Sequence, residues 1–382
     1  MSVPAEHQTH SKGQPTDKRT TGAVRLSILS RFCLIAIRPF LDLTKIASWA
    51  IIVHRIQQRK GRVMAQSAPG KFYRKGVSLV ELFKMFPDNE SAEKWFEQAR
   101  WGGEIRCAHC DSDNISKVKH PTMPYRCRTC RKHFSAKTGS IMHGSNVGYQ
   151  KWAIAIYQMT TNLKGVSAMK LHRDLDISYK SAWFMEHRIR EALEYNNEVF
   201  EGEVEIDESY FGGKEKNKHA NKKLNAGRGT VGKTAVVGMK ERETNQVQAQ
   251  VVEATDKETL QGFAVENTTP DTVVYTDESR SYTGLPRPHA TVNHGTGEYV
   301  REQAHTNGLE SFWSMMKRGY IGTYHQMSPK HLHRYVNEFS GRHNMRPMDT
   351  IDQMAAVVAG MDDKRLRYKD LIAGGPAYPP VD

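Results

Sequence analysis

Residues 203–211 read Glu-Val-Glu-Ile-Asp-Glu-Ser-Tyr-Phe, and they begin a region in which short β-rich runs replace the helical patterns that precede it. This run is predicted to be a strand. Further strands are predicted near residues 234–240, 246–252 and 272–276, and helices near 257–266, 306–318 and 328–342. Strands and helices that share one continuous core predict an α/β or α+β domain.

The order of these elements narrows the fold class. Three early strands, a helix, a fourth strand and later helices fit a ribonuclease-H-like α/β domain, which we expect over residues 201–346. An insertion over residues 212–233 interrupts the first hairpin and carries seven Lys or Arg against the single acid Glu215. It indicates a mobile basic loop. A solvated loop is the simpler interpretation, but its place after Asp207 favours contact with a phosphate backbone.

Two aspartates, Asp207 and Asp277, stand at the ends of apolar strand residues. Further along, residues 305–319 read His-Thr-Asn-Gly-Leu-Glu-Ser-Phe-Trp-Ser-Met-Met-Lys-Arg-Gly with helical periodicity. Glu310 and Lys317, seven residues apart, lie almost in line beside its apolar stripe, so both face the same neighbour. Three carboxylates that converge from two strands and a helix suit a hard divalent cation, and a pair of such cations serves phosphodiester chemistry.

Other acids and one amide surround these positions. Strand alternation places Asp207 and Glu208 on opposite faces, so only one of them is expected to point at the site. Glu205 shares a face with Asp207 but lies deeper in the strand, which makes Asp207 the predicted ligand. Asn307 is expected to cap the helix of Glu310.

Four of the five cysteines form two tight pairs, which are separated by sixteen residues. The pairs are Cys107 with Cys110 and Cys127 with Cys130. Two Cys-x2-Cys turns at this spacing predict a closed tetrahedral Zn²⁺ site of structural type, since four sulfurs leave no position open for water. We therefore expect a zinc ribbon over residues 104–140, and basic residues that surround it make it a candidate DNA-contacting element: Arg106, Lys117, Lys119, Arg126, Arg128, Arg131 and Lys132.

Helical patterns flank the ribbon. Residues 64–103 predict short bracing helices, and residues 141–200 have the length and break pattern of a helix-turn-helix DNA-binding segment. The break falls at Asp176-Ile177-Ser178, and the second helix would carry basic residues on its outer faces: Lys180, His187, Arg188 and Arg190. An ordinary helical hairpin in a core is the alternative interpretation.

The composition indicates the cellular compartment and the kind of partner that the protein binds. The net charge is +13, and residues 1–63 contribute eleven Lys or Arg against three Asp or Glu, an excess that suits a polyanion. This stretch is an extension that is either not native, with Met64 as the true start, or disordered; residues 347–382 are taken as a C-terminal tail. Paired cysteines in a metal-site pattern indicate a reducing cytoplasm. We expect no membrane span, because charges interrupt the apolar residues 26–56.

The succession of motifs resembles one family. A four-cysteine ribbon is followed by a helical segment, Glu-Ile-Asp-Glu-Ser-Tyr-Phe-Gly-Gly, Tyr-Thr-Asp-Glu and His-Thr-Asn-x2-Glu-Ser-Phe-Trp-Ser-x2-Lys-Arg-Gly. This order resembles insertion-sequence transposases of the DDE superfamily whose catalytic part is called the ISXO-type domain. The resemblance covers Met64 to the 340s and implies a ribonuclease-H-like catalytic fold.

The resemblance also implies a mechanism. Asp207, Asp277 and Glu310 would hold two Mg²⁺ ions, and Lys317 would hold a phosphate. Transposon ends in double-stranded DNA would be cut, and the freed 3′-hydroxyl would then attack target DNA. The active assembly would be a homodimer or higher oligomer, since two ends must be held together, and it would associate with the nucleoid when bound to DNA.

Two alternatives stay open at the level of sequence. One is a sequence-specific DNA-binding regulator in which the α/β domain is a relic; the presence of all three acids argues against it. The other is a ribonuclease-H-like nuclease that cuts without joining ends.

Overall fold

The computed structural model describes residues 74–194, 199–213, 217, 219–224, 229–292 and 307–373. The predicted extension of residues 1–63 lies outside these ranges, and so does part of the basic insertion. Among the described residues, no helix is long and apolar enough to span a membrane.

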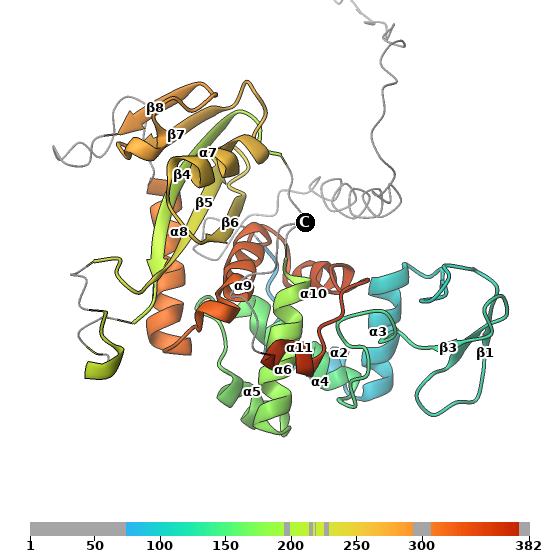
Figure 1. The fold of residues 1–382 in the computed structure, drawn as a ribbon. Helices are drawn as coiled ribbons and strands as arrows, with labels where there is room; N and C mark the ends of the chain where they lie inside the picture. Colours follow the sequence, from blue (N-terminus) through green and yellow to red (C-terminus); the bar gives the residue numbers. More distant parts are fainter. Residues whose placement is uncertain are drawn as a thin grey trace, which may run out of the picture. The chain divides into compact units, whose positions relative to one another are not determined.

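A mixed five-stranded sheet forms the centre of the predicted catalytic domain (Figure 1). Its strands stand in the order β6-β5-β4-β7-β8; β4, β5 and β6 pair antiparallel, while β7 pairs parallel with both β4 and β8. Their bounds are β4 Glu203–Phe211, β5 Thr234–Glu241, β6 Val247–Val252, β7 Val273–Asp277 and β8 His289–Val292. The first four strands lie where the sequence predicts them, and β8 is an addition.

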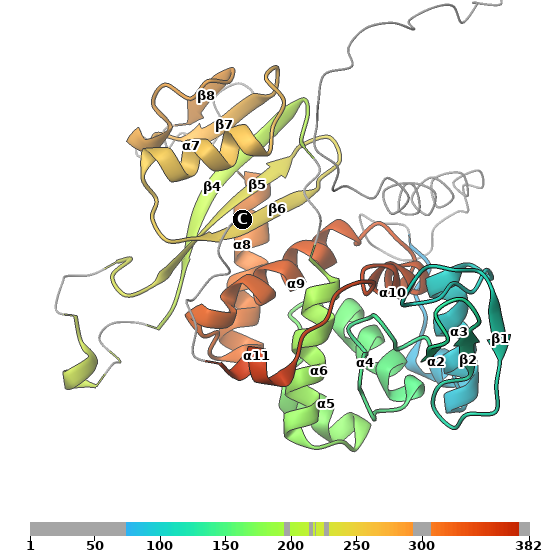
Figure 2. The same ribbon diagram turned by 45° about the vertical axis from the view of Figure 1, so that its right-hand side comes forward.

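Helices cover both faces of this sheet, as Figure 2 shows. One face packs against α7 (Lys257–Glu266), and the other packs against α8 (Asn307–Gly319) and α9 (Leu332–Asn344). Alternation along β4 divides its side chains between the two cores: Ile206 joins the α7 side and Phe211 joins the α8 side. The α8 side includes four side chains of the predicted apolar stripe: Leu309, Phe312, Trp313 and Met316. Each such burial contributes about 1.5–3 kcal/mol.

A helical region precedes the sheet and has its own core. Its helices are α2 Leu79–Met85, α3 Asn89–Trp101, α4 Tyr149–Thr161, α5 Ala168–Leu175 and α6 Tyr179–Ala192. The predicted break between α5 and α6 is confirmed: Asp176 adopts a left-handed conformation with φ 46°, and the Ser178 hydroxyl accepts the Ser181 N–H at 3.2 Å. This cap begins α6 where the sequence indicates.

The basic residues of α6 do not form the outer face that the sequence predicts. His187, Arg188 and Arg190 are buried, and only Lys180 of the four is exposed. The Arg190 guanidinium donates to Glu338 of α9 at 2.7 Å and to Glu186 at 3.1 Å. A buried guanidinium needs such carboxylate partners, so this helix is committed to its own core at these positions.

The C-terminal residues 347–382 are not a free tail over the part that is described. Residues 350–359 form α10 (Thr350–Ala359), whose Met354, Val357 and Val358 belong to the same core as α3, α4 and α6. A short helix, α11 (Tyr368–Ile372), follows. The core of the helical region therefore combines residues that precede the sheet domain in the sequence with residues that follow it.

The ribbon is a separate three-stranded antiparallel sheet. Its strands are β1 Ile115–Lys117, β2 Tyr125–Cys127 and β3 His133–Phe134, in that order. The remaining short elements are η2 Ala220–Lys222, η3 Arg280–Tyr282, the π-helical turn η5 Tyr320–Tyr324 and η6 Pro329–His331. A buried pair, Tyr125 and Phe134, packs beside Cys107 and Cys127, so the apolar core of the ribbon is small.

Candidate active site and zinc site

The two predicted aspartates meet where β4 and β7 stop pairing. The parallel ladder runs from Glu203 opposite Val273 to Glu205 opposite Tyr275, and Asp207 and Asp277 each lie two residues beyond its last pair. Asp277 is the last residue of β7, whereas Asp207 lies in the middle of β4, so the prediction that both aspartates end strands is right only for Asp277. Because the two strands run parallel and in register, the two carboxylates come together where β4 and β7 no longer pair. This end of the ladder leaves an opening between the two strands.

A third carboxylate, that of Glu208, joins them. One oxygen from each of Asp207, Glu208 and Asp277 lies within 4.8 Å of the other two. Glu208 does leave β4 on the opposite face, where it accepts a hydrogen bond from the buried Tyr282 hydroxyl. Because β7 has ended at this point, side chains from both faces of β4 reach the opening, and the prediction that only one of the two points at the site is wrong.

Glu310 and Lys317 lie on the exposed side of α8. Among the described residues, Glu310 is not part of the group within 4.8 Å. Both nevertheless act on Asp207. Burial raises the pKa of Asp207 to about 6; the charges of Asp277 and Glu310 add to the rise, while the Glu208 backbone N–H and Lys317 oppose it. The helix therefore places both predicted residues within electrostatic reach of Asp207.

Crowding also affects Glu208. Burial raises its pKa to about 7, with Asp277 and Asp207 adding to the rise and the Tyr282 hydroxyl opposing it. Carboxylates held this close repel one another when ionised, and a divalent cation between them removes that cost. The donor set consists of hard oxygens, as Mg²⁺ requires.

Glu205 has a different task from its neighbours on β4. Its carboxylate is buried, accepts the Leu309 N–H at 3.0 Å and pairs with Arg242 at 3.2 Å. A carboxylate at a helix N-terminus satisfies an unpaired N–H and stabilises the helix dipole. The helix α8 begins at Asn307, so Asn307 is its first helical residue and does not stand at the preceding cap position where the sequence places it.

Two glycines allow α8 to approach the sheet closely. Gly238 stands opposite Asp207 on β5, and a Cβ there would lie 2.6 Å from Cζ2 of Trp313. A Cβ on Gly308 would lie 2.8 Å from Oε2 of Glu205. Trp313 thus occupies the space beside Asp207 that a side chain on β5 would otherwise fill, and this contact sets the distance of α8 from the aspartates.

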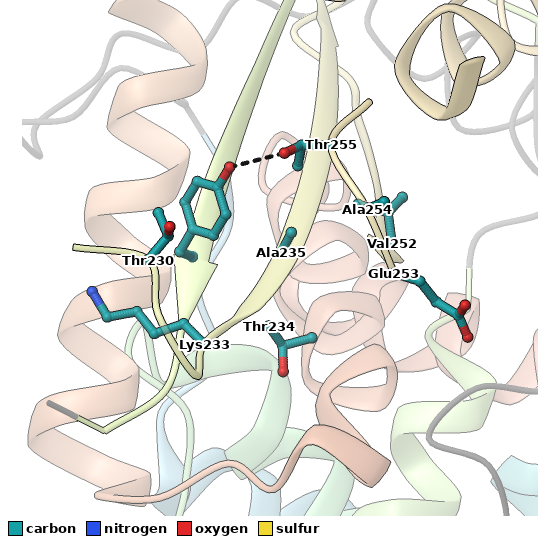
Figure 3. A pocket seen from close by; sticks show the side chains of 9 residues that line it. Thr230, Lys233, Thr234, Ala235, Val252, Glu253, Ala254 and Thr255 are labelled. Atoms are coloured by element: carbon teal, nitrogen blue, oxygen red, sulfur yellow. Dashed lines mark hydrogen bonds between the residues drawn. The ribbon is translucent and has the colours of Figure 1, made fainter. Parts of the chain in front are cut away.

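Two open hollows adjoin these acids. The first, of about 430 Å³, begins two residues beyond Glu208 and is lined by Tyr210, Thr230, Lys233, Thr234, Ala235, Val252, Glu253, Ala254 and Thr255. Figure 3 shows the Lys233 ammonium and the Glu253 carboxylate at opposite sides of it. The second, of about 420 Å³, follows α8 and is lined by Asn307, Glu310, Ser311, Ser314, Met315 and Arg318. Each hollow offers one carboxylate, one cation and several hydroxyls, and the last two are groups that bind phosphate oxygens.

The four cysteines of the ribbon meet as predicted. Their sulfurs lie within 4.8 Å of one another, with Cys107 to Cys130 at 3.6 Å and Cys110 to Cys127 at 3.7 Å. Four sulfurs at about 2.3 Å from a tetrahedral Zn²⁺ would stand about 3.8 Å apart, so the donor set fits that ion. The Cys130 N–H points at the Cys127 sulfur and lowers the pKa of that thiol to about 6, whereas burial raises the pKa of Cys107 to about 12. Thiolates are the form that binds zinc.

Comparison with known proteins assigns these two sites to named domains. Residues 199–344 match the model of the ISXO2-like transposase domain, and residues 87–133 match the transposase zinc-ribbon domain. This chain belongs to the insertion-sequence transposases. The transposase domain contains β4, β7 and α8, and thus all four residues predicted for catalysis; the ribbon match contains all four cysteines.

Two relatives of the transposase extend the likeness. The first is an uncharacterized protein in transposable element ISH50 of Halobacterium salinarum, 28% identical over 273 residues, which are 68% of this chain and 92% of that protein. The second is an uncharacterized transposase-like protein of Haemophilus influenzae, 31% identical over 97 residues, which are 25% of this chain and 77% of that protein. A chain from a simian T-cell lymphotropic virus intasome structure matches with 13% identity and a TM-score of 0.23 over 50% of this chain and 65% of that one, too low to carry an argument.

Proposed function

We propose that this transposase uses a ribonuclease-H-like DDE site to cut transposon ends in double-stranded DNA and join the freed 3′-hydroxyl to target DNA. Support comes first from the sheet: β4, β5 and β6 form an antiparallel meander, and β7 and β8 continue it in parallel after a crossover helix. The observation that carries the proposal is the meeting of the Asp207 and Asp277 carboxylates at matching register.

Asp207, Asp277 and Glu310 would hold two Mg²⁺ ions, which supply charge stabilisation for the attacking and leaving oxygens. The rest of the chemistry falls to the chain and the DNA. In the first step a water oxygen bonds to the phosphorus and the 3′-oxygen of the transposon end leaves. In the second step that 3′-oxygen bonds to a target phosphorus while the target's own 3′-oxygen leaves, so each bond formed replaces one broken.

Lys317 would bind a phosphate oxygen beside the reacting one. Its ammonium lies on the exposed side of α8 and lowers the pKa of Asp207, so its charge reaches the site. A compact cation at that position neutralises charge that develops on the phosphate during attack.

The path of the DNA would follow the basic surfaces beside the acids. Lys233 contributes to the hollow beyond Glu208, and Arg318 contributes to the hollow along α8. The seven basic residues of the ribbon are exposed, as binding to phosphates requires: Arg106, Lys117, Lys119, Arg126, Arg128, Arg131 and Lys132. Because two transposon ends must be joined, the assembly on DNA would contain two or more copies of the chain.

The test uses the purified transposase with DNA from the ends of its own element and Mg²⁺. We expect joined products with the wild type and a loss of about 100- to 1000-fold with Asp277→Asn, because charge stabilisation of the transition state is removed. Asp271→Asn is the matched control, since Asp271 is an exposed acid just before the same strand. Joining that survives in Asp277→Asn would refute the site. Cleavage without joining in the wild type would point to a nuclease, and binding alone to a regulator.

A further inference from the structure

We infer that Glu208 is an additional metal ligand of this site and that the Tyr282 hydroxyl positions it; the inference rests on the proposed DDE function. Glu208 is the third member of the carboxylate group within 4.8 Å that also contains Asp207 and Asp277. A cation that touches both aspartates is therefore within reach of Glu208 without any movement of the backbone.

The orientation of Glu208 is fixed by a buried partner. Tyr282 is the last residue of η3, its side chain is 0% exposed, and it packs in the same core as Val204 and Ile206 of β4. Its hydroxyl donates to Oε1 of Glu208. A hydrogen bond from a rigid second residue is how proteins orient the carboxylates that ligate metals, and it favours the ionised acceptor.

Because Glu310 lies apart from the aspartates, Glu208 would supply the third carboxylate for the first cation. Glu310 is exposed on α8 and, among the described residues, stands outside the carboxylate group. Two aspartates alone give a hard cation few of the oxygens it prefers. With Glu208, the enzyme without DNA presents three carboxylates, so the first cation is bound before Glu310 takes part.

The neighbouring acid Glu278 provides the contrast. It follows Asp277 as Glu208 follows Asp207, yet it is exposed and lies outside the group. The reason is that β7 ends at Asp277, whereas β4 continues to Phe211 and holds Glu208 in an extended backbone beside the opening. The two Asp-Glu pairs look alike in sequence, and the strand lengths distinguish them.

If the hydrogen bond between Glu208 and Tyr282 had only a structural role, the expected metal binding of a Glu208 variant would differ. In Glu208→Gln, the amide oxygen still accepts the Tyr282 hydroxyl, so the contact between β4 and η3 is preserved while the negative charge is removed. A structural role predicts unchanged metal binding in this variant, whereas a ligand role predicts weaker binding.

The experiment measures Mn²⁺ binding to the full chain without DNA, by the loss of the free-ion signal in electron paramagnetic resonance. We expect Glu208→Gln to weaken binding about 10-fold or more, and Tyr282→Phe to weaken it less, on the scale of residues that support metal ligands. Glu278→Gln is the matched control and should bind like the wild type. Thermal unfolding of each variant separates loss of the site from loss of the fold.

A measurement on the wild type covers the case in which Glu208→Gln does not fold. Fe²⁺ placed at the site with peroxide produces hydroxyl radicals, which cut the backbone near the bound ion; we expect cuts near residues 207–208 and 277–282, and cuts absent from 207–208 would overturn the inference.

Three results separate the inference from the function on which it rests. Wild-type Mn²⁺ affinity in a folded Glu208→Gln, with affinity lost in Asp207→Asn, would overturn the role of Glu208 and leave the DDE site intact. No Mn²⁺ binding by the DNA-free wild type would overturn it as well. Joining that persists in Asp277→Asn would instead refute the proposed function.

Discussion

The two groups of candidate metal ligands in this transposase are assembled in different ways. The cysteines come from two turns within residues 107–130 and carry their own small core. The carboxylates come from β4 and β7, with Glu310 added from α8, and they rely on a sheet with helices on both faces. The cysteine site should need Zn²⁺ in order to fold. The carboxylate site should keep its shape without Mg²⁺. The predictions below test that difference, beginning with the largest expected effect.

Loss of one thiolate should unfold the ribbon. Cys127→Ser removes a zinc ligand, and structural zinc contributes about 10 kcal/mol or more to the folding of such small units. We expect the zinc content to fall and residues 104–140 to become sensitive to protease, while the sheet domain keeps its thermal transition. Cys33→Ser is the control, because it changes the fifth cysteine, outside the set. A ribbon that stays protease-resistant in Cys127→Ser would show that its apolar core suffices.

A methyl group on Gly238 should displace α8. The added Cβ would stand 2.6 Å from the Trp313 ring, so the helix must shift. Overpacking of this kind costs about 1–3 kcal/mol, and joining should fall as well because Glu310 and Lys317 move with α8. Gly262→Ala is the control: Gly262 lies inside α7 with nothing within 4 Å of the added Cβ, and alanine there should stabilise the helix by about 0.5–1 kcal/mol. Equal unfolding temperatures for the two variants would contradict the close contact.

The acids should make the magnesium-free protein sensitive to pH. Folding raises the pKa of Asp207 to about 6 and that of Glu208 to about 7. The native state therefore holds more protons than the unfolded chain between about pH 4 and 7, and stability falls as the pH rises through that window.

Comparison with Asp207→Asn isolates this effect. The variant should lose less stability than the wild type between pH 5 and 8, by roughly 1–2 kcal/mol after allowance for solvent screening. Contributions from the zinc thiolates cancel, since both proteins have them. Thermal unfolding at the two pH values measures the difference, Asp271→Asn is the control, and added Mg²⁺ should reduce the wild-type loss at pH 8. Parallel pH profiles would mean that folding does not raise the pKa of Asp207.

The smallest effect should come from a single basic side chain. Lys233→Ala removes the cation of the hollow beyond Glu208, and one lost phosphate contact lowers the salt dependence of DNA binding by about one unit of slope. Lys84→Ala is the control, because Lys84 is exposed on α2, outside the basic insertion and outside the hollow. Titration of DNA binding against salt measures both, and identical slopes would place the DNA elsewhere.

The sequence was sufficient where spacing or period determines the geometry. The Cys-x2-Cys turns, the four main strands and the apolar stripe of α8 follow from local patterns, and the structure has them. Local patterns could not show that Arg190 is buried against Glu338, because its partner lies on a distant helix. They could not place Glu208 either, since its reach depends on where β7 ends. The acid-to-metal assignments and the DNA contacts remain predictions.

The return of α10 to the first helical core has a consequence for synthesis. Met354, Val357 and Val358 pack with Phe96 and Trp152, so that core lacks part of its interior until the ribosome has released residues beyond 358. Domains otherwise tend to fold as they emerge. In this chain the core of the early helices stays incomplete until α10 has emerged, and a product that stops after the sheet domain would leave an apolar surface uncovered.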